Sequence, residues 1–159
     1  MRSAVALSVM IWLTYGTAMA ETSHDSTDQG AALYKRCAVC HLSSGKGVPS
    51  SIPPLGEQTS AFMDKPDGRA YIVMVVSKGL SGPINVNGQN FRGFMPPQKM
   101  NDSKLAILLN YIAGSIIKPP ADAAPFTADE IADIRKKHKS LTPGKVRLIR
   151  PADNREPSP

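Results

Sequence analysis

Apolar residues recur at helical spacing in three stretches of this chain, and few stretches show the alternation typical of strands. The stretch over residues 29–36 predicts a short first helix, with Asp28 as a plausible N-cap. The stretch over residues 69–79 predicts an amphipathic helix that ends at Gly79. The third predicted helix begins at Asn101 or Asp102, either of which can cap it. Its apolar positions are Leu105, Leu108, Leu109, Ile112 and Ile116.

The segments between these helices carry loop and turn signals. Residues 42–54 are rich in Ser, Gly and Pro, which indicates a loop. Residues 80–100 form a long connection, within which Asn87-Gly88 predicts a two-residue hairpin turn. Pro119-Pro120 closes the third helix.

A further helix is predicted beyond these prolines. Thr127 and Glu130 form a capping box, and Phe126 can pack onto Ile131 as a hydrophobic staple. We expect this helix to run to about Lys139 and an extended tail to begin at residue 142. The predicted organisation is therefore a segment over residues 1–20, a domain over residues 21–120, and a C-terminal helix with a basic tail over residues 121–159.

The first helix runs into Cys37-Ala38-Val39-Cys40-His41, a C-x-x-C-H motif typical of covalent haem attachment. Two thiols three positions apart can each add to one vinyl group of the same porphyrin. The histidine that follows is then carried under the ring, where its imidazole can bind the iron. We therefore predict one covalently bound haem c, with Cys37 and Cys40 as the attachment sites and His41 as a metal ligand.

Other interpretations of the motif are weaker. A zinc site usually needs four ligands, and these are the only two cysteines in the chain. The other histidines, His24 and His138, lie near the N-terminus and in the basic tail. A thioredoxin-like pair would follow a strand rather than a helix, and a plain disulfide needs no histidine.

The haem also bears on the fold. Residues 28–117 are about 90 residues of helix and turn, and a core of that size is marginal unaided. A covalently held porphyrin would supply the missing apolar mass. We predict an all-α fold around one haem, with a small hairpin loop, an extra C-terminal helix and a basic tail.

The first twenty residues predict export. Arg2 gives a positive n-region, residues 4–13 an apolar h-region, and Ala18-Met19-Ala20 a small-x-small cleavage site. An uncleaved membrane anchor is the alternative. Thioether formation also requires an exported chain, and in a bacterium that compartment is the periplasm. We expect a periplasmic mature protein that begins near Glu21.

The net charge of +6 is unevenly distributed. Residues 21–133 carry ten Lys or Arg against eleven Asp or Glu, whereas residues 135–159 carry eight basic residues against two acidic ones. The tail is either a solvated extension or a docking element for an acidic partner protein or an anionic membrane surface. Nucleic acid is an unsuitable target for an exported protein.

The ligand on the other face of the iron must come from elsewhere in the chain. Met74 lies in an apolar helical run, and Met63 lies in a loop without rigid neighbours. Met95 is favoured, because Pro96-Pro97 restrict its backbone in a loop that can wrap the far haem face. Met100 is the second candidate, and an open iron site is the third.

The loop after the motif holds a possible partner for the histidine. Two prolines in Ile52-Pro53-Pro54-Leu55 fix the backbone and offer no N–H. Such a segment suits a carbonyl that accepts a hydrogen bond from a metal-bound histidine. An ordinary rigid turn explains the composition equally well.

The early C-x-x-C-H, the Pro53-Pro54-Leu55 segment and the late Met95-Pro96 together resemble the class I c-type cytochromes over residues 28–117. The resemblance implies crossed first and last core helices, with Gly30 packed closely against Tyr111. It also implies His41/Met95 ligation, with the carbonyl of Pro53 accepting from His41. The loop over residues 82–95 is similar to that of monohaem domains serving periplasmic dehydrogenases and copper nitrite reductases.

Iron with His and Met ligands has no open position for substrate, so one-electron transfer is the expected activity. No other catalytic constellation is visible in the sequence, and we expect an electron carrier or the haem subunit of an oxidoreductase rather than an enzyme in its own right. The expected partner is a redox protein: a dehydrogenase, reductase or oxidase. The alternative is a haem sensor in which a small ligand displaces Met95.

Overall fold

The computed structural model describes residues 21–118 and 123–152, with side chains from residue 25 onward. The predicted signal peptide over residues 1–20 lies outside this range. So do the Pro119-Pro120 pair and the last seven residues, among them Arg155.

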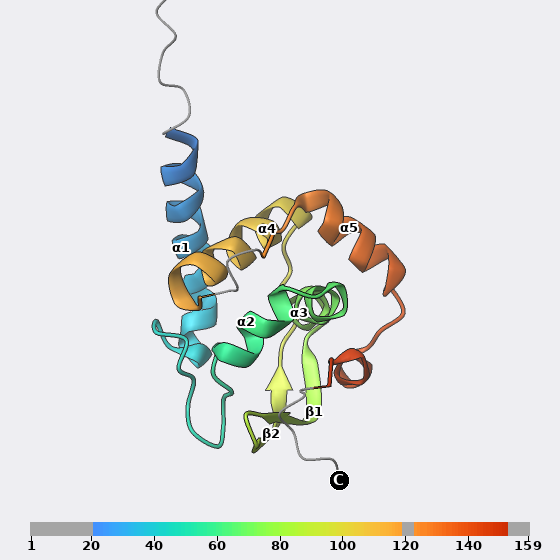
Figure 1. Cartoon of the computed structure of the whole chain (residues 1–159). Coiled ribbons are helices and arrows are strands. Elements are labelled where there is room, and N and C mark those ends of the chain that lie inside the picture. The colour runs from blue at the N-terminus through green and yellow to red at the C-terminus, as the bar shows by residue number, and fades with distance from the viewer. Residues whose placement is uncertain (1–20, 119–122, 153–159) are drawn as a thin grey trace, which may run out of the picture.

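Helices α1 (Glu21–His41) and α4 (Asp102–Tyr111) cross one another at one side of the molecule (Figure 1). A Cβ atom added to Gly30 of α1 would lie 2.4 Å from the Cβ of Tyr111. Only glycine therefore allows this close approach, as the resemblance implied. The side chain of Asn101 caps α4 by accepting a hydrogen bond from the N–H of Lys104 at 2.9 Å, and a π-helical turn, Ile112–Ile116, continues the helix.

Helix α1 is longer than the sequence suggested. It is already helical at Glu21, so Asp28 lies inside the helix and is not its N-cap. Residues 21–28 contain no proline or glycine, and Gln29 Nε2 donates to Asp25 Oδ2 at 2.9 Å one turn away. None of the helices in the described ranges combines the length and hydrophobicity needed to cross a bilayer.

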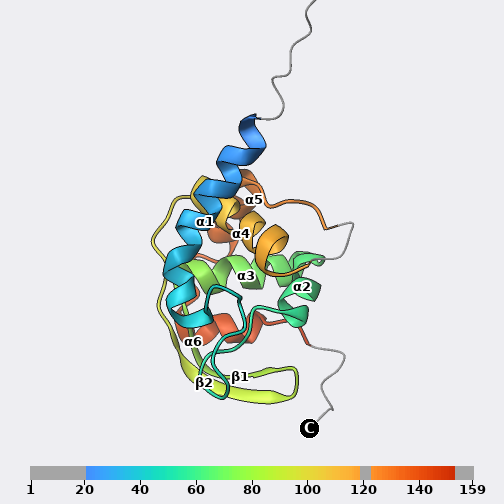
Figure 2. The ribbon, with the colours of Figure 1, turned by 90° about the vertical axis from the view of Figure 1, so that its left-hand side faces the viewer.

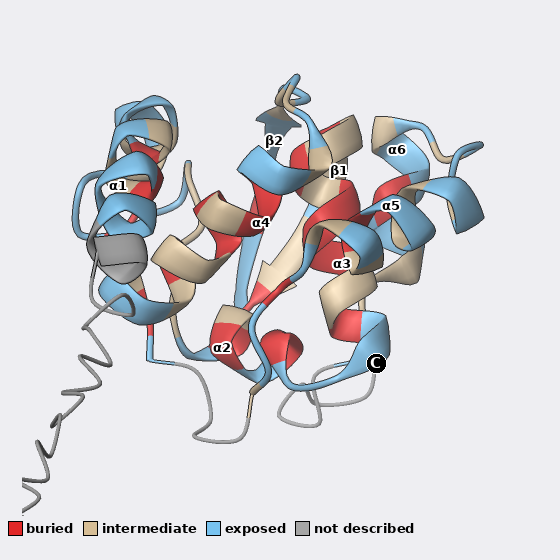
Figure 3. Ribbon diagram, turned by 90° about the horizontal axis from the view of Figure 1, so that it is seen from above, coloured by how far each residue is buried: buried red, intermediate tan, exposed pale blue. Residues whose placement is uncertain are grey.

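Helix α3 (Pro66–Lys78) lies at the centre of the fold, with α2 (Glu57–Met63) packed against it (Figures 1 and 3). The sequence predicted a single apolar face for α3. Instead Val73 and Met74 are completely buried together with Ile72 and Val76. The additional burial arises because α5 and α6, which follow far along the chain, cover α3 as well.

The connection after α3 is mostly a β-ribbon. Strands β1 (Leu80–Val86) and β2 (Gln89–Met95) pair antiparallel, with Leu80 opposite Met95 (Figure 2). The predicted turn at Asn87-Gly88 is confirmed, because both residues have positive φ, 53° and 79°. The pairing extends further than expected and places Met95 at the end of a strand rather than in a loop.

The C-terminal part of the chain folds back over α3 and β1. Helix α5 (Ala128–Lys137) starts at Thr127, whose Oγ1 accepts from the N–H of Glu130 at 3.2 Å. The expected extended tail is wrong over residues 143–149. A helical turn α6 (Pro143–Val146) and a 3-10 turn η2 (Arg147–Ile149) follow instead, because the completely buried Val146 anchors this segment against the core.

Candidate haem site

The C-x-x-C-H motif forms the C-terminal end of α1. Residues three apart on a helix share a face, so Cys37 and Cys40 present two free thiols on the same side, the first half-buried and the second exposed. Burial raises the pKa of the Cys37 thiol, with Arg36 opposing and Cys40 adding to the rise. The helix ends directly after His41, where Leu42 adopts a positive φ of 63°.

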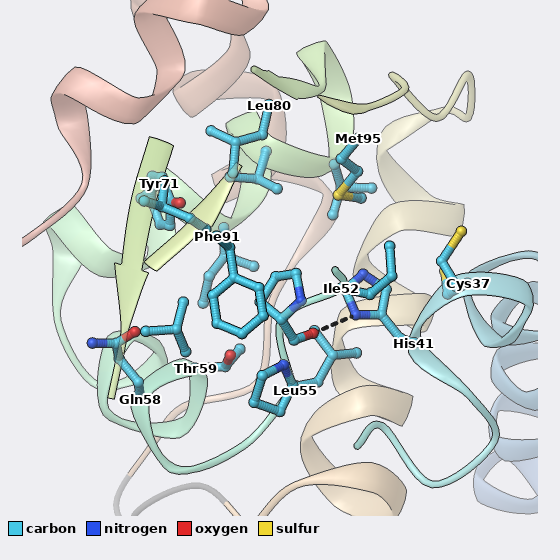
Figure 4. Close-up of a pocket in the computed structure, with 18 of the residues that line it drawn as sticks. Cys37, His41, Ile52, Leu55, Gln58, Thr59, Tyr71, Leu80, Phe91 and Met95 are labelled. Atoms are coloured by element: carbon cyan, nitrogen blue, oxygen red, sulfur yellow. Dashed lines mark hydrogen bonds between the residues drawn. The ribbon is translucent and has the colours of Figure 1, made fainter. Parts of the chain in front are cut away.

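The imidazole of His41 is fixed by the loop that follows. Its Nδ1 donates a hydrogen bond to the carbonyl oxygen of Pro53 at 3.0 Å (Figure 4). Burial lowers the pKa of His41, against the raising effect of this hydrogen bond, and so favours the neutral ring. Because Nδ1 is engaged, Nε2 is the nitrogen left to bind a metal.

A glycine makes this hydrogen bond possible. Gly47 has a positive φ of 64°, and a Cβ atom there would lie 2.3 Å from the carbonyl oxygen of Ile52 and 2.8 Å from that of Pro53. Any larger residue would push the Pro53 segment away from His41. The sequence showed a glycine-rich loop but gave no indication that Gly47 was this position.

Cys37, Cys40, His41, Pro53 and Met95 all line one large pocket, of about 1300 Å³ including its open mouth. Its walls come from the end of α1, the following loop, α2, α3, the hairpin and α4, and they are overwhelmingly apolar (Figure 4). The apolar lining includes Ile52, Leu55, Phe62, Ile72, Val75, Leu80, Ile84, Phe91, Leu108 and Ile112.

Met95 reaches this pocket from the last position of β2. Its backbone is closely enclosed, because a Cβ atom on Gly79 would lie 2.4 Å from the carbonyl oxygen of Met95. Pairing with Leu80 and this contact with Gly79 hold the residue in place. The side chain is partly buried against the core.

The other methionines are placed differently. Met74 is completely buried and Met100 partly so, and neither lines the pocket. Met63 does line it, but the expectation of a loop there is wrong. It is the last residue of α2 and is only 2% exposed. Among the methionines in the described ranges, Met95 is thus the one that combines a pocket position with an origin on the hairpin.

One end of the pocket is polar, and the sequence did not reveal it. Gln58, Thr59 and Tyr71 lie on the side away from Cys37 (Figure 4), and Arg150 from the C-terminal segment also lines the pocket. Gln58 is buried although it belongs to a short polar helix. Arg150 could not be told from the other basic residues of the tail by spacing or composition.

The residues present fit a covalently bound haem. The pocket offers apolar walls for the porphyrin faces, two unpaired thiols at its rim, an oriented neutral imidazole and a thioether. Imidazole and thioether are established axial ligands of haem iron. Within the described ranges, no cluster of three or more His, Cys, Asp or Glu side chains could instead hold a metal ion.

Comparison with known proteins agrees with this geometry. Residues 27–115 match the family model described as cytochrome c. Two proteins named cytochrome c-552, both from Thermus thermophilus, are each 37% identical to the chain over 120 residues. These alignments cover 74% of this chain and 90% and 80% of the two relatives. The chain therefore belongs to the cytochrome c family, as a monohaem class I member with one covalently bound haem c that serves as an electron carrier.

Proposed function

We propose that this chain is an exported one-electron carrier in which Cys37 and Cys40 form the thioether bonds and His41 and Met95 are the axial iron ligands. The observation that carries the proposal is the shared pocket. His41 enters it from α1 with its Nδ1 bonded to Pro53, and Met95 enters it from the hairpin. The two side chains come from segments 54 residues apart in the sequence.

The bound haem supplies an iron that cycles between Fe(II) and Fe(III), and His/Met ligation favours a high potential. The protein residues keep that chemistry to electron transfer. Pro53 holds the His41 ring in one orientation, and the enclosed backbone of Met95 keeps its thioether in place. The apolar walls offer few polar partners for water beside the porphyrin faces.

We place the carrier in the periplasm, on the strength of the signal-like N-terminus. There it would serve a dehydrogenase, reductase or oxidase, either as a free carrier or as a bound haem subunit. Exposed basic side chains on and after α5 offer a docking surface for an acidic partner: Lys136, Lys137, Lys139, Lys145 and Arg147. Recovery of the haem-loaded protein in the periplasmic fraction tests the location, and a cytoplasmic product would contradict it.

The ligand assignment is tested by Met95→Ala with Met100→Ala as the matched control. Met95→Ala should lose the weak far-red sulfur-to-iron charge-transfer band and should bind carbon monoxide in the reduced state. Met100→Ala should keep the band and resist carbon monoxide, because Met100 does not line the pocket. The reverse pattern would assign the ligand to Met100. Rapid carbon monoxide binding by the unaltered protein would instead favour a sensor.

A further inference from the structure

The polar end of the haem pocket contains a single side chain with a permanent charge. Among the described residues that line the pocket, Arg150 is the only Lys, Arg, Asp or Glu. Its polar neighbours there are Gln58, Thr59 and Tyr71, all uncharged at neutral pH. A cation at one end of an otherwise apolar pocket is costly unless an anion compensates for it.

The surroundings of Arg150 orient its guanidinium and leave part of it available. Nη2 donates hydrogen bonds to Gln58 Oε1 and to the carbonyl oxygen of Asn85. The guanidinium carbon lies 5.0 Å from the ring centre of Phe62 and 5.6 Å from that of Tyr71. The guanidinium also forms a side-chain hydrogen bond with Tyr71. Because a guanidinium has five N–H donors, donors beyond those that bond Gln58, Asn85 and Tyr71 remain for a carboxylate.

The C-terminal fold delivers this side chain to the pocket. The buried Val146 anchors α6, which packs on α3 and β1. Beside it, Arg147 runs against Gly82, where an added Cβ atom would lie 3.2 Å from Arg147 Cδ. Turn η2 then carries the chain to Arg150, whose N–H bonds back to the carbonyl of Arg147 at 3.2 Å. Arg150 lies outside the residues 27–115 that match the family model.

Haem chemistry supplies the matching anion. The two vinyl groups that become thioethers lie at one edge of the macrocycle, and the two propionates lie at the opposite edge. Attachment at Cys37 and Cys40 therefore directs the propionates toward the end of the pocket that holds Gln58, Tyr71 and Arg150. We propose that Arg150 binds a haem propionate, so that the C-terminal segment of residues 123–150 closes the pocket and sets the charge beside the haem.

The inference rests on the proposed haem site and adds an electrostatic consequence. A guanidinium beside a carboxylate lowers the carboxylate pKa by about 1–3 units. The propionate then stays ionised at neutral pH in both iron oxidation states, and the potential stays flat with pH. Tyr71 is the other titratable group at this end, and burial raises its pKa while Arg150 lowers it. No acidic side chain lines this end within the described residues.

The test compares haem-loaded Arg150→Gln, Arg150→Lys and Arg147→Gln with the unaltered protein. Arg147→Gln is the matched control, because it removes the same charge from the same segment at an exposed side chain outside the pocket lining. The midpoint potential is measured from pH 4.5 to 9. Arg150→Gln should lower the midpoint potential. The pH range over which the potential changes should also move upward by about 1–3 pH units. Arg150→Lys should keep a profile near that of the unaltered protein, and Arg147→Gln should change neither value.

Equal potentials and equal pH profiles for Arg150→Gln and Arg147→Gln would overturn the inference. If Arg150→Gln does not fold, a proton NMR titration of the propionate methylene groups in the unaltered protein decides. One propionate should titrate at least about 1 unit below its partner, and two equal ordinary values would reject the ion pair. Absence of covalent haem from the unaltered protein would instead reject the proposed function.

Discussion

The attachment region, residues 37–53, and the C-terminal clasp, residues 123–150, both contribute side chains to the same pocket, but they are held in place by different means. The attachment region is local in sequence: two thiols, an imidazole and its carbonyl partner lie within 17 residues. The clasp depends on long-range polar contacts. Arg69 pairs with Glu130 at 2.6 Å, Arg135 with Asp102 at 2.5 Å, and Arg150 bonds to Gln58.

The comparison shows that neighbouring residues of one segment can have different roles, depending on whether they are buried or exposed. The basic residues of the clasp are divided by burial. Arg135 and Arg150 turn inward and bond to the core, whereas Lys136 and Lys137 face solvent. A run of positive charge that suggested either a docking surface or a solvated tail therefore also contains structural contacts. Substitutions in the attachment region should therefore affect covalent haem binding, whereas substitutions in the clasp should lower stability without loss of the covalently bound haem.

The largest expected effect comes from the attachment region. Replacing Cys37 and Cys40 together by alanine removes both thioether bonds, so acidic acetone should extract all of the haem from the denatured protein. Each single variant should retain haem through the remaining bond. Val39→Ala is the control, because Val39 is 81% exposed and lies between the two cysteines. Haem retained by the double variant would contradict the assignment.

A smaller effect is expected from loosening the clasp. Arg69 donates to both oxygens of Glu130 and to the carbonyls of Met63 and Ala124, and its guanidinium carbon lies 3.8 Å from the ring centre of Phe126. Arg69→Gln should lower the free energy of unfolding in urea by about 2–3 kcal/mol, since Glu130 is left partly buried without its partner. Covalent haem should be retained in full.

Lys78→Gln is the control for this clasp variant. Lys78 Nζ donates to the carbonyl of Lys139 at an exposed position, at 3.1 Å. Its loss should cost no more than about 0.5 kcal/mol. A double-mutant cycle of Arg69→Gln with Glu130→Gln should give a coupling energy of about 1–3 kcal/mol. Additive effects of the two substitutions would show that the pair does not hold the clasp.

The smallest expected effect is an alkaline pH dependence on the α1 side. Burial raises the pKa of Tyr34 from its usual 10 to about 12, and the neighbouring Cys37 and Tyr111 add to the rise. Between these pH values the unfolded state binds fewer protons than the folded one, so this contribution to stability is complete below pH 10 and is lost toward pH 12. The slope is at most about 1.4 kcal/mol per pH unit.

Tyr34→Phe isolates this contribution. The variant should be less stable by about 1 kcal/mol at pH 7, because Tyr34 loses its 2.9 Å hydrogen bond to the carbonyl of Leu42. The difference in urea-unfolding free energy between the two proteins should shrink as the pH rises above 10. A difference that stays constant to pH 12 would show that Tyr34 ionises equally easily in the folded and unfolded states.

The sequence predicted those parts of the fold that a few neighbouring residues determine. The turn at Asn87-Gly88 and the end of α3 at Gly79 each depend on a few neighbouring residues, and both are as predicted. The cap of α4 is Asn101, one of the two candidates that the sequence offered. Helix α2 was missed because its sequence, EQTSAFM, is too short and too polar to show a clear period. The length of the hairpin was missed because strand pairing depends on the partner strand.

The sequence by itself determined the chemistry of attachment, because two thiols and an imidazole within five consecutive residues act as one unit on any short helical turn. It also indicated the family, because the C-x-x-C-H motif, the Pro53-Pro54-Leu55 segment and the late Met95-Pro96 can all be read directly from the sequence. Only the tertiary structure decided that Gly47 brings Pro53 to His41, that Gly79 encloses the backbone of Met95, and that Arg150 reaches the far end of the pocket. Those contacts depend on how loops, strands and the C-terminal segment pack together, and their energies depend on burial that no local pattern encodes.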